Sequence, residues 1–215
     1  TNAFRQVQIY KALNWNFPVF AHMPLLHGTD GAKLSKRHGA LGVEAYRSMG
    51  VLPEAMNNYL LRLGWSHGDD EIISQDQAIR WFDVKDVGRA ASRFDMEKLI
   101  SVNGHYIRHA DVDYLVSLVL PIIRKNFKGK LADQGVDRLK NGMISLRDRA
   151  RNIIELAEIS TFYALSRPIS YDAKAAKLLD RPAVALLEEL RIVLSNLQDW
   201  VQSELETVVH DHALA

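Results

Sequence analysis

Helical hydrophobic patterns run almost without interruption through the second half of the chain, and they limit the fold most. After Asp111, apolar residues recur at the three- and four-residue spacing of one helix face. The regularly spaced short strands and turns that mark sandwiches and barrels do not occur there. The sequence therefore predicts a mainly α protein.

Start and stop residues divide the region before Asp111 into helices. Pro53 and Gly64 bracket an apolar segment, which is the arrangement of an N-terminal proline and a C-terminal glycine expected around a helix. Ser74 and Gln77 have the spacing of a capping box. These signals predict one helix over 53–63 and a second that begins after Ser74.

Three longer helices are expected from similar signals. Asp95 is predicted to cap a helix that stops at Asn103 and Gly104. Ser145 is predicted to cap a long helix that ends near residue 166, and a further helix is expected over 182–209. The sequence shows no internal repeat.

Composition is ordinary for a globular protein with a hydrophobic core. The 215 residues are 47% apolar and 25% charged. The absence of cysteine excludes disulfides and zinc ribbons and fits a reducing compartment. No stretch approaches the roughly 20 apolar residues of a membrane span. We therefore expect a protein that acts in the cytoplasm without a membrane partner.

Charge is distributed unevenly although the net charge is only +1. Residues 124–151 contain nine Lys and Arg against three Asp, which gives a local charge of +6. Residues 183–215 contain six acidic residues against one Arg, which gives −5. A contact with nucleic acid is therefore expected near the middle of the chain rather than at its end.

The segment 28–40, Gly-Thr-Asp-Gly-Ala-Lys-Leu-Ser-Lys-Arg-His-Gly-Ala, combines glycines with cations. Glycine permits tight turns and close approach of a ligand, and neighbouring cations and backbone amides suit phosphate oxygens. The spacing is not that of a Walker loop. A turn at 29–31 followed by a phosphate-binding loop is therefore predicted, with Lys33, Lys36 and Arg37 as its cations.

The order Lys33-Leu34-Ser35-Lys36-Arg37 resembles the second signature of class I aminoacyl-tRNA synthetases. With the His-Gly-Ala that follows, it is most similar to the bacterial glutamyl-tRNA synthetases, and so are the segments 60–69 and 94–107. The first signature of the class, His-x-Gly-His, does not occur in this sequence. The resemblance is therefore to the C-terminal portion of such an enzyme, without its N-terminal catalytic core.

This resemblance implies a domain organisation. Residues 1–42 would be the end of the class I nucleotide-binding core and would carry the signature loop. Residues 43–110 would be a helical region that contacts the tRNA stem. Residues 111–215 would be an all-α anticodon-binding bundle, incomplete at its C-terminus.

The resemblance also implies a glutamate–tRNA ligase that uses ATP with Mg²⁺. Lys36 and Lys33 would be catalytic, and Lys33, Leu34, Ser35, Lys36 and Arg37 would bind ATP; no metal-ligand set is expected. The partners would be tRNA(Glu), glutamate and ATP, and the sequence leaves open whether tRNA(Gln) is also charged. We expect a monomer, and we expect the chain alone to be inactive.

Arg147, Arg149 and Arg151 are the candidate tRNA contacts, because they lie in the basic region and on the helix predicted to begin at Ser145. Arginine can pair with phosphate or a guanine edge and can stack on a base. The alternative is a solvated basic helix start, with Asp148 as an internal partner. Arg149 is the first choice for an RNA contact.

The sequence also leaves two alternatives to the ligase. The chain could act as a stand-alone tRNA-binding module. The residues around Ser66, Gly-Trp-Ser-His-Gly, also fit the nucleophile elbow of serine hydrolases. That elbow needs a strand before its serine, whereas a helix is predicted over 53–63, so the hydrolase is the weaker alternative.

Overall fold

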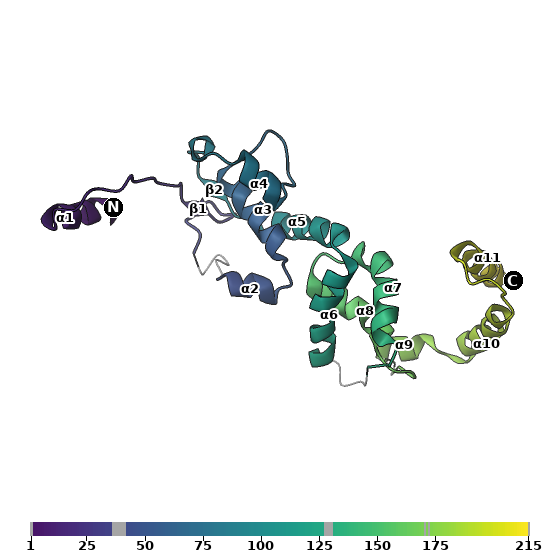
Figure 1. Cartoon of the computed structure of the whole chain (residues 1–215). Coiled ribbons are helices and arrows are strands. Elements are labelled where there is room, and N and C mark those ends of the chain that lie inside the picture. Colours follow the sequence, from purple (N-terminus) through teal and green to yellow (C-terminus); the bar gives the residue numbers. More distant parts are fainter. Residues whose placement is uncertain (1, 36–41, 127–130, 170, 172, 215) are drawn as a thin grey trace. The chain divides into compact units, whose positions relative to one another are not determined.

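The computed structural model describes residues 2–35, 42–126, 131–169, 171 and 173–214 (Figure 1). Within these ranges almost all regular structure is helical, so the predicted fold class is confirmed. The elements, in chain order, are α1 (Asn2–Ala12), β1 (Leu26–His27), α2 (Val43–Ser48), α3 (Pro53–Gly64), α4 (Gln75–Trp81), the 3₁₀ turn η2 (Val84–Asp86), β2 (Ser92–Arg93), α5 (Met96–His109), α6 (Val112–Asn126), α7 (Gly135–Arg147), α8 (Ile153–Ala164), α9 (Ala173–Leu178), α10 (Arg181–Ser195) and α11 (Gln202–Leu214).

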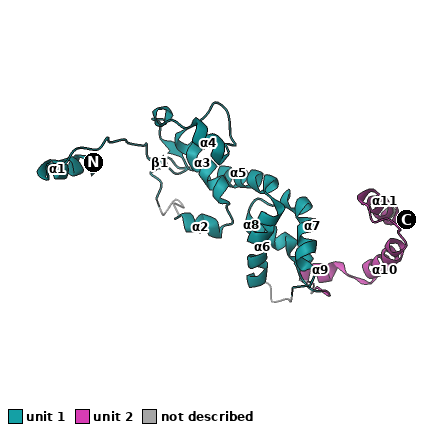
Figure 2. Ribbon diagram, in the orientation of Figure 1, with its two compact units in different colours: residues 1–166 teal, residues 167–215 magenta. Residues whose placement is uncertain are grey.

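The chain forms two compact units, residues 1–166 and 167–215 (Figure 2). The first contains α1 to α8 with both strands, and the second contains α9 to α11. The domain boundary predicted between residues 110 and 111 falls in the short link between α5 and α6, inside the first unit. That boundary stays a prediction.

A two-stranded parallel sheet connects the N-terminal segment to the helices that follow. β1 pairs with β2, with Leu26 opposite Ser92, and the Phe94 amide donates to the His27 carbonyl at 2.8 Å. The Ser92 hydroxyl donates to the Leu63 carbonyl in α3. The run of residues 15–25 that leads into β1 has no regular secondary structure. The two prolines of that run lack an amide hydrogen, which limits such pairing.

One continuous hydrophobic core extends from α2 through α8. In its first part, Phe94 packs between Tyr46 and Tyr59, with ring centroids 5.8 and 5.3 Å away. In its second part, α6, α7 and α8 contribute fully buried side chains: Leu115, Val119, Ile123, Leu139, Met143, Leu156 and Ala157. The apolar periodicity of residues 112–164 therefore marks the buried faces of packed helices.

Three predicted helix starts are confirmed. Ser74 and Gln77 form a reciprocal capping box at α4. Asp95 caps α5, and its carboxylate accepts hydrogen bonds from the amides of Glu97 and Lys98. Pro53 lies in the first turn of α3, as predicted. Local capping chemistry therefore identified these N-termini from sequence alone.

The predicted end of the helix that follows Asp95 is wrong. α5 continues through Asn103 and Gly104 to His109. Asn103 is fully buried, and its side chain bonds to the backbone of Gly50, Leu52 and Arg151 instead of ending its own helix. Tertiary hydrogen bonds therefore override the tendency of Asn-Gly to break a helix.

The two long helices predicted in the second half are also wrong, because each is divided in two. Ser145 lies near the end of α7, and α8 begins after Asn152, whose side chain accepts from the Glu155 amide at 2.9 Å. The helix predicted over 182–209 comprises α10 and α11, with a break between Ser195 and Gln202. Asp180 caps α10.

Candidate functional site

A tight reversal of the chain after β1 leads into the predicted phosphate loop. The Gly28 amide donates to the Ala32 carbonyl at 2.8 Å, and the Leu34 amide donates to the Leu26 carbonyl at 2.8 Å. His27 and Lys33 form an antiparallel bridge. The segment 26–34 is thus a small hairpin attached to the edge of the β1–β2 sheet.

The sequence of this hairpin explains its shape. Gly31 has φ of +78°, a left-handed conformation that glycine adopts without strain. The Asp30 carboxylate accepts a hydrogen bond from the Ala32 amide at 3.0 Å, as aspartate often does in turns. The turn predicted at 29–31 is therefore confirmed.

The predicted ATP-binding residues begin where this hairpin ends. Lys33 is exposed, whereas Leu34 is half-buried and packs against the hydrophobic core. Ser35 is half-buried. Lys36 and Arg37 lie outside the described residues. Leu34 therefore anchors the start of the loop, and the neighbouring Lys33 ammonium is open to a ligand.

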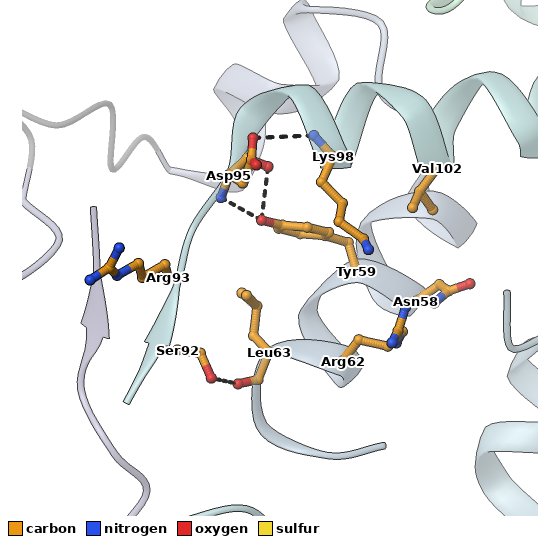
Figure 3. Close-up of a pocket in the computed structure, with 9 residues that line it drawn as sticks. All are labelled: Asn58, Tyr59, Arg62, Leu63, Ser92, Arg93, Asp95, Lys98 and Val102. Atoms are coloured by element: carbon orange, nitrogen blue, oxygen red, sulfur yellow. Dashed lines mark hydrogen bonds between the residues drawn. The ribbon is translucent and has the colours of Figure 1, made fainter. Parts of the chain in front are cut away.

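A cleft of about 240 Å³ lies beside β2, between α3 and α5 (Figure 3). Its lining residues are Asn58, Tyr59, Arg62, Leu63, Ser92, Arg93, Asp95, Lys98 and Val102. Two of the three cations on its walls are paired with Glu71, at 2.5 Å from Lys98 and 3.4 Å from Arg62. The hydrogen bond from Lys98, with the contribution of Arg62, lowers the pKa of Glu71.

The one carboxylate that lines this cleft, that of Asp95, already accepts hydrogen bonds from backbone amides of α5. Asp95 caps α5, and its backbone carbonyl and amide both bond to the Tyr59 hydroxyl, at 2.8 and 2.6 Å (Figure 3). Burial raises the pKa of Tyr59. Because its carboxylate and two of its three cations already have partners, this cleft serves mainly to join α3 to α5.

The three arginines predicted to contact tRNA have different environments. Arg147, the last residue of α7, donates from Nη1 to the Ala110 carbonyl at 2.9 Å and is half-buried. Arg149 and Arg151 are exposed in the turn between α7 and α8. Arg151 lies 3.9 Å from the Glu155 carboxylate. We call residues 148–151 the basic turn.

The prediction that these arginines lie on one helix beginning at Ser145 is wrong. The three arginines do not share one helix, because α7 ends at Arg147 and α8 begins at Ile153. Arg149 stays the first choice because its side chain is exposed. Arg147 contributes a contact between α5 and α7, which the sequence did not predict.

The structure around Ser66 differs from a nucleophile elbow. α3 leads directly into this segment, so a helix rather than a strand precedes the serine. His67 stacks on Trp81 with ring centroids 4.2 Å apart, and its Nδ1 lies 3.0 Å from an Asp70 carboxylate oxygen. The serine hydrolase alternative therefore lacks its required geometry.

Neither a metal-binding cluster nor a membrane-spanning helix occurs in the described residues. In the part of the chain that the structure describes, no group of three or more His, Cys, Asp or Glu side chains could hold a metal ion. Among the described helices, none is long and apolar enough to cross a membrane.

Comparison with known families matches almost the whole chain. A model for the catalytic domain of class I tRNA synthetases (E and Q) matches residues 1–101. A model for an anticodon-binding domain matches residues 114–215. The region with the hairpin and the cleft thus corresponds to the first family, and the basic turn to the second.

The chain is similar to bacterial glutamate–tRNA ligases. The chain is 54% identical to glutamate–tRNA ligase 2 of Paramagnetospirillum magneticum over 207 residues, which cover 96% of this chain and 43% of the relative. It is 54% identical to that of Rhodospirillum centenum over 213 residues, with 99% and 46% coverage. The chain therefore spans less than half the length of these relatives.

A solved structure supports the same relationship. The glutamate–tRNA ligase of Elizabethkingia meningosepticum, crystallised with its amino acid, aligns with a TM-score of 0.70 at 28% identity. The alignment covers 96% of this chain and 44% of that one. The fold described above is therefore shared with an enzyme of known structure.

Proposed function

This chain belongs to the glutamate–tRNA ligase family of class I synthetases, and from that premise we propose that it acts in the ATP-dependent joining of glutamate to tRNA(Glu). One observation carries the proposal: a catalytic-domain match and an anticodon-binding match adjoin in a single chain. The reaction would take place in the cytoplasm, in a monomeric enzyme. Whether tRNA(Gln) is also charged would be tested with the assay described below.

In the first step, a glutamate carboxylate oxygen attacks the α-phosphorus of ATP. A new P–O bond forms, the bond to the bridging oxygen breaks, and pyrophosphate leaves. Negative charge increases on the leaving group, so a cation placed there stabilises the transition state. We assign this role to Lys36, with Lys33 and Arg37 in support.

The described part of the loop fits a polyphosphate. The exposed Lys33 ammonium follows the glycine turn, and Ser35 comes two residues later. Lysine suits such a site because its flexible stem lets the charge follow moving phosphate oxygens. Mg²⁺ would accompany ATP as its bound ion.

In the second step, the glutamyl group moves from the adenylate to the terminal ribose of tRNA, and AMP leaves. We assign tRNA contacts to the exposed Arg149 and Arg151 of the basic turn, and a weaker one to Arg147. Arg149 and Arg151 are able to pair with phosphates or to stack on unpaired bases.

The experiment that tests this function is pyrophosphate exchange by the full-length protein with tRNA(Glu) and glutamate present. Lys36→Ala should slow exchange by about 100-fold or more, because it removes a transition-state charge contact. Lys85→Ala, which changes an exposed lysine in η2, is the control and should leave the rate unchanged. Equal rates for the two variants would remove Lys36 from the mechanism.

A further inference from the structure

Asn103 is a buried amide whose hydrogen bonds all lie outside its own helix. None of its surface is exposed. Its Oδ1 accepts from the Leu52 amide at 2.8 Å, and its Nδ2 donates to the carbonyls of Gly50 at 3.2 Å and Arg151 at 2.8 Å. Both donors and one acceptor position of the side chain are therefore used.

The backbone groups that Asn103 joins belong to distant parts of the sequence. Gly50 and Leu52 precede α3, within the catalytic-domain match, whereas Arg151 lies between α7 and α8, within the anticodon-binding match. The Gly50 carbonyl also accepts from the Ile153 amide at 3.0 Å. We call these five residues the Asn103 junction.

The junction leaves little freedom to its members. Gly50 has φ of +79°, and a methyl group added to it would lie 2.8 Å from the Ile153 nitrogen. Moving Arg151 away would leave buried polar groups unpaired, which is unfavourable in a low-dielectric interior. The junction therefore fixes the backbone of the basic turn relative to the start of α3.

We propose that Asn103 is a positioning residue that couples anticodon recognition to charging, which rests on the proposed function. A tRNA bound through Arg149 and Arg151 is held at a fixed place relative to α3 and α5. The correct anticodon then places the acceptor end for reaction. A wrong anticodon places it poorly, and this difference depends on a rigid junction.

Asn58 provides a matched control within the same core. Its exposure is 3%. Its Oδ1 accepts from the Ile73 amide and the Tyr106 hydroxyl, both at 2.9 Å, and its Nδ2 donates to the Glu71 carbonyl at 3.1 Å. All of these partners lie between residues 43 and 110. Asn58 is thus as buried and as well bonded, but it does not reach the basic turn.

The test compares Asn103→Asp and Asn58→Asp in the full-length protein. Each change keeps an acceptor oxygen and removes two N–H donors at nearly constant shape. The measurement is kcat/KM for charging of two tRNA(Glu) transcripts, one with the native anticodon and one with an altered anticodon. The kcat/KM for the native transcript divided by that for the altered transcript reports the coupling.

We expect Asn103→Asp to reduce this ratio about tenfold, within the range typical of coupling between distant sites. The loss should come mainly from kcat on the native transcript, because the exposed arginines still bind. Asn58→Asp should keep the ratio of the unaltered protein. Partial unfolding lowers kcat/KM equally for both transcripts, so it does not change the ratio.

An unchanged ratio in Asn103→Asp would overturn the coupling role, and so would an equal fall in Asn58→Asp. Asn103→Ser, which cannot make all three bonds, must give the same direction as Asn103→Asp. An unaltered protein that fails to charge the native transcript would instead overturn the proposed function. The two failures are therefore distinguishable.

Discussion

The contact between α7 and α8 depends on the absence of a side chain at Gly135. This residue is buried at the start of α7, and a methyl group added to it would lie 2.4 Å from the Ala164 carbonyl oxygen and 3.1 Å from its carbon. These are backbone atoms, which cannot rotate away. The same oxygen accepts from the Ala132 amide at 3.0 Å, so Gly135→Ala would force the two segments apart.

The expected cost follows from three contributions. Overpacking costs about 1–3 kcal/mol, and losing the Ala132 hydrogen bond costs about 1 kcal/mol. Replacing glycine by alanine in a helix returns up to about 1 kcal/mol. The net loss is about 2 kcal/mol, and at about 2–4 °C per kcal/mol for a chain of this size it should lower Tm by about 4–8 °C.

Gly104→Ala is a matched control with the opposite sign. Gly104 is also a buried helical glycine, but its nearest contacts would be an Arg108 guanidinium nitrogen at 3.4 Å and the Arg151 Cα at 3.7 Å, which are ordinary distances. The helix preference for alanine should therefore raise Tm by about 1–4 °C. Thermal unfolding followed by circular dichroism measures both. If Gly135→Ala melts at or above the parent temperature, the packing argument is refuted.

Three further perturbations test the capping, the pH response and the basic turn. Asp95→Ala removes the acceptor for two amides at the start of α5 and should lower the unfolding free energy in urea by about 1 kcal/mol. Burial, then His109 and Arg108, lowers the pKa of His105. The contribution of His105 to stability is therefore complete above about pH 6.5 and declines as the pH falls below that value. In urea melts, His105→Gln should lessen the loss of stability between pH 7.5 and 5.5. Arg149→Ala should weaken tRNA binding and give a shallower salt slope in filter binding, whereas Arg147→Ala should mainly lower Tm; equal binding by the parent and Arg149→Ala would contradict this.

Local chemistry was sufficient to predict the starts of the helices in the first half. Ser74 with Gln77 and Asp95 each satisfy amides within three residues, so the information lies in the adjacent sequence. The turn at Gly31 is similarly local. The candidate phosphate loop was recognised from residue order, and its hairpin adds the reason why Lys33 is exposed beside a packed Leu34.

Non-local contacts explain why Asn103 was misjudged. In sequence, Asn-Gly indicates a helix end, because neither residue favours a helix interior. The partners that keep Asn103 inside α5 lie 48 to 53 residues away, at Gly50, Leu52 and Arg151. No local pattern identifies such partners, so the sequence predicts a helix end at Asn103 instead of its buried hydrogen bonds.

The same limitation accounts for the error at the basic turn. Serine is a common N-cap residue, and the prediction that Ser145 caps a long helix placed all three arginines on that helix. Asn152 is the residue that caps, because the chain between Arg147 and Ile153 must turn so that the Arg151 carbonyl meets Asn103 and the Ile153 amide meets Gly50. Charge alone identifies the basic region in the sequence. The contacts with α5 and Gly50 determine which arginines stay exposed, so the surface proposed for tRNA depends on a buried amide in the preceding region of the chain.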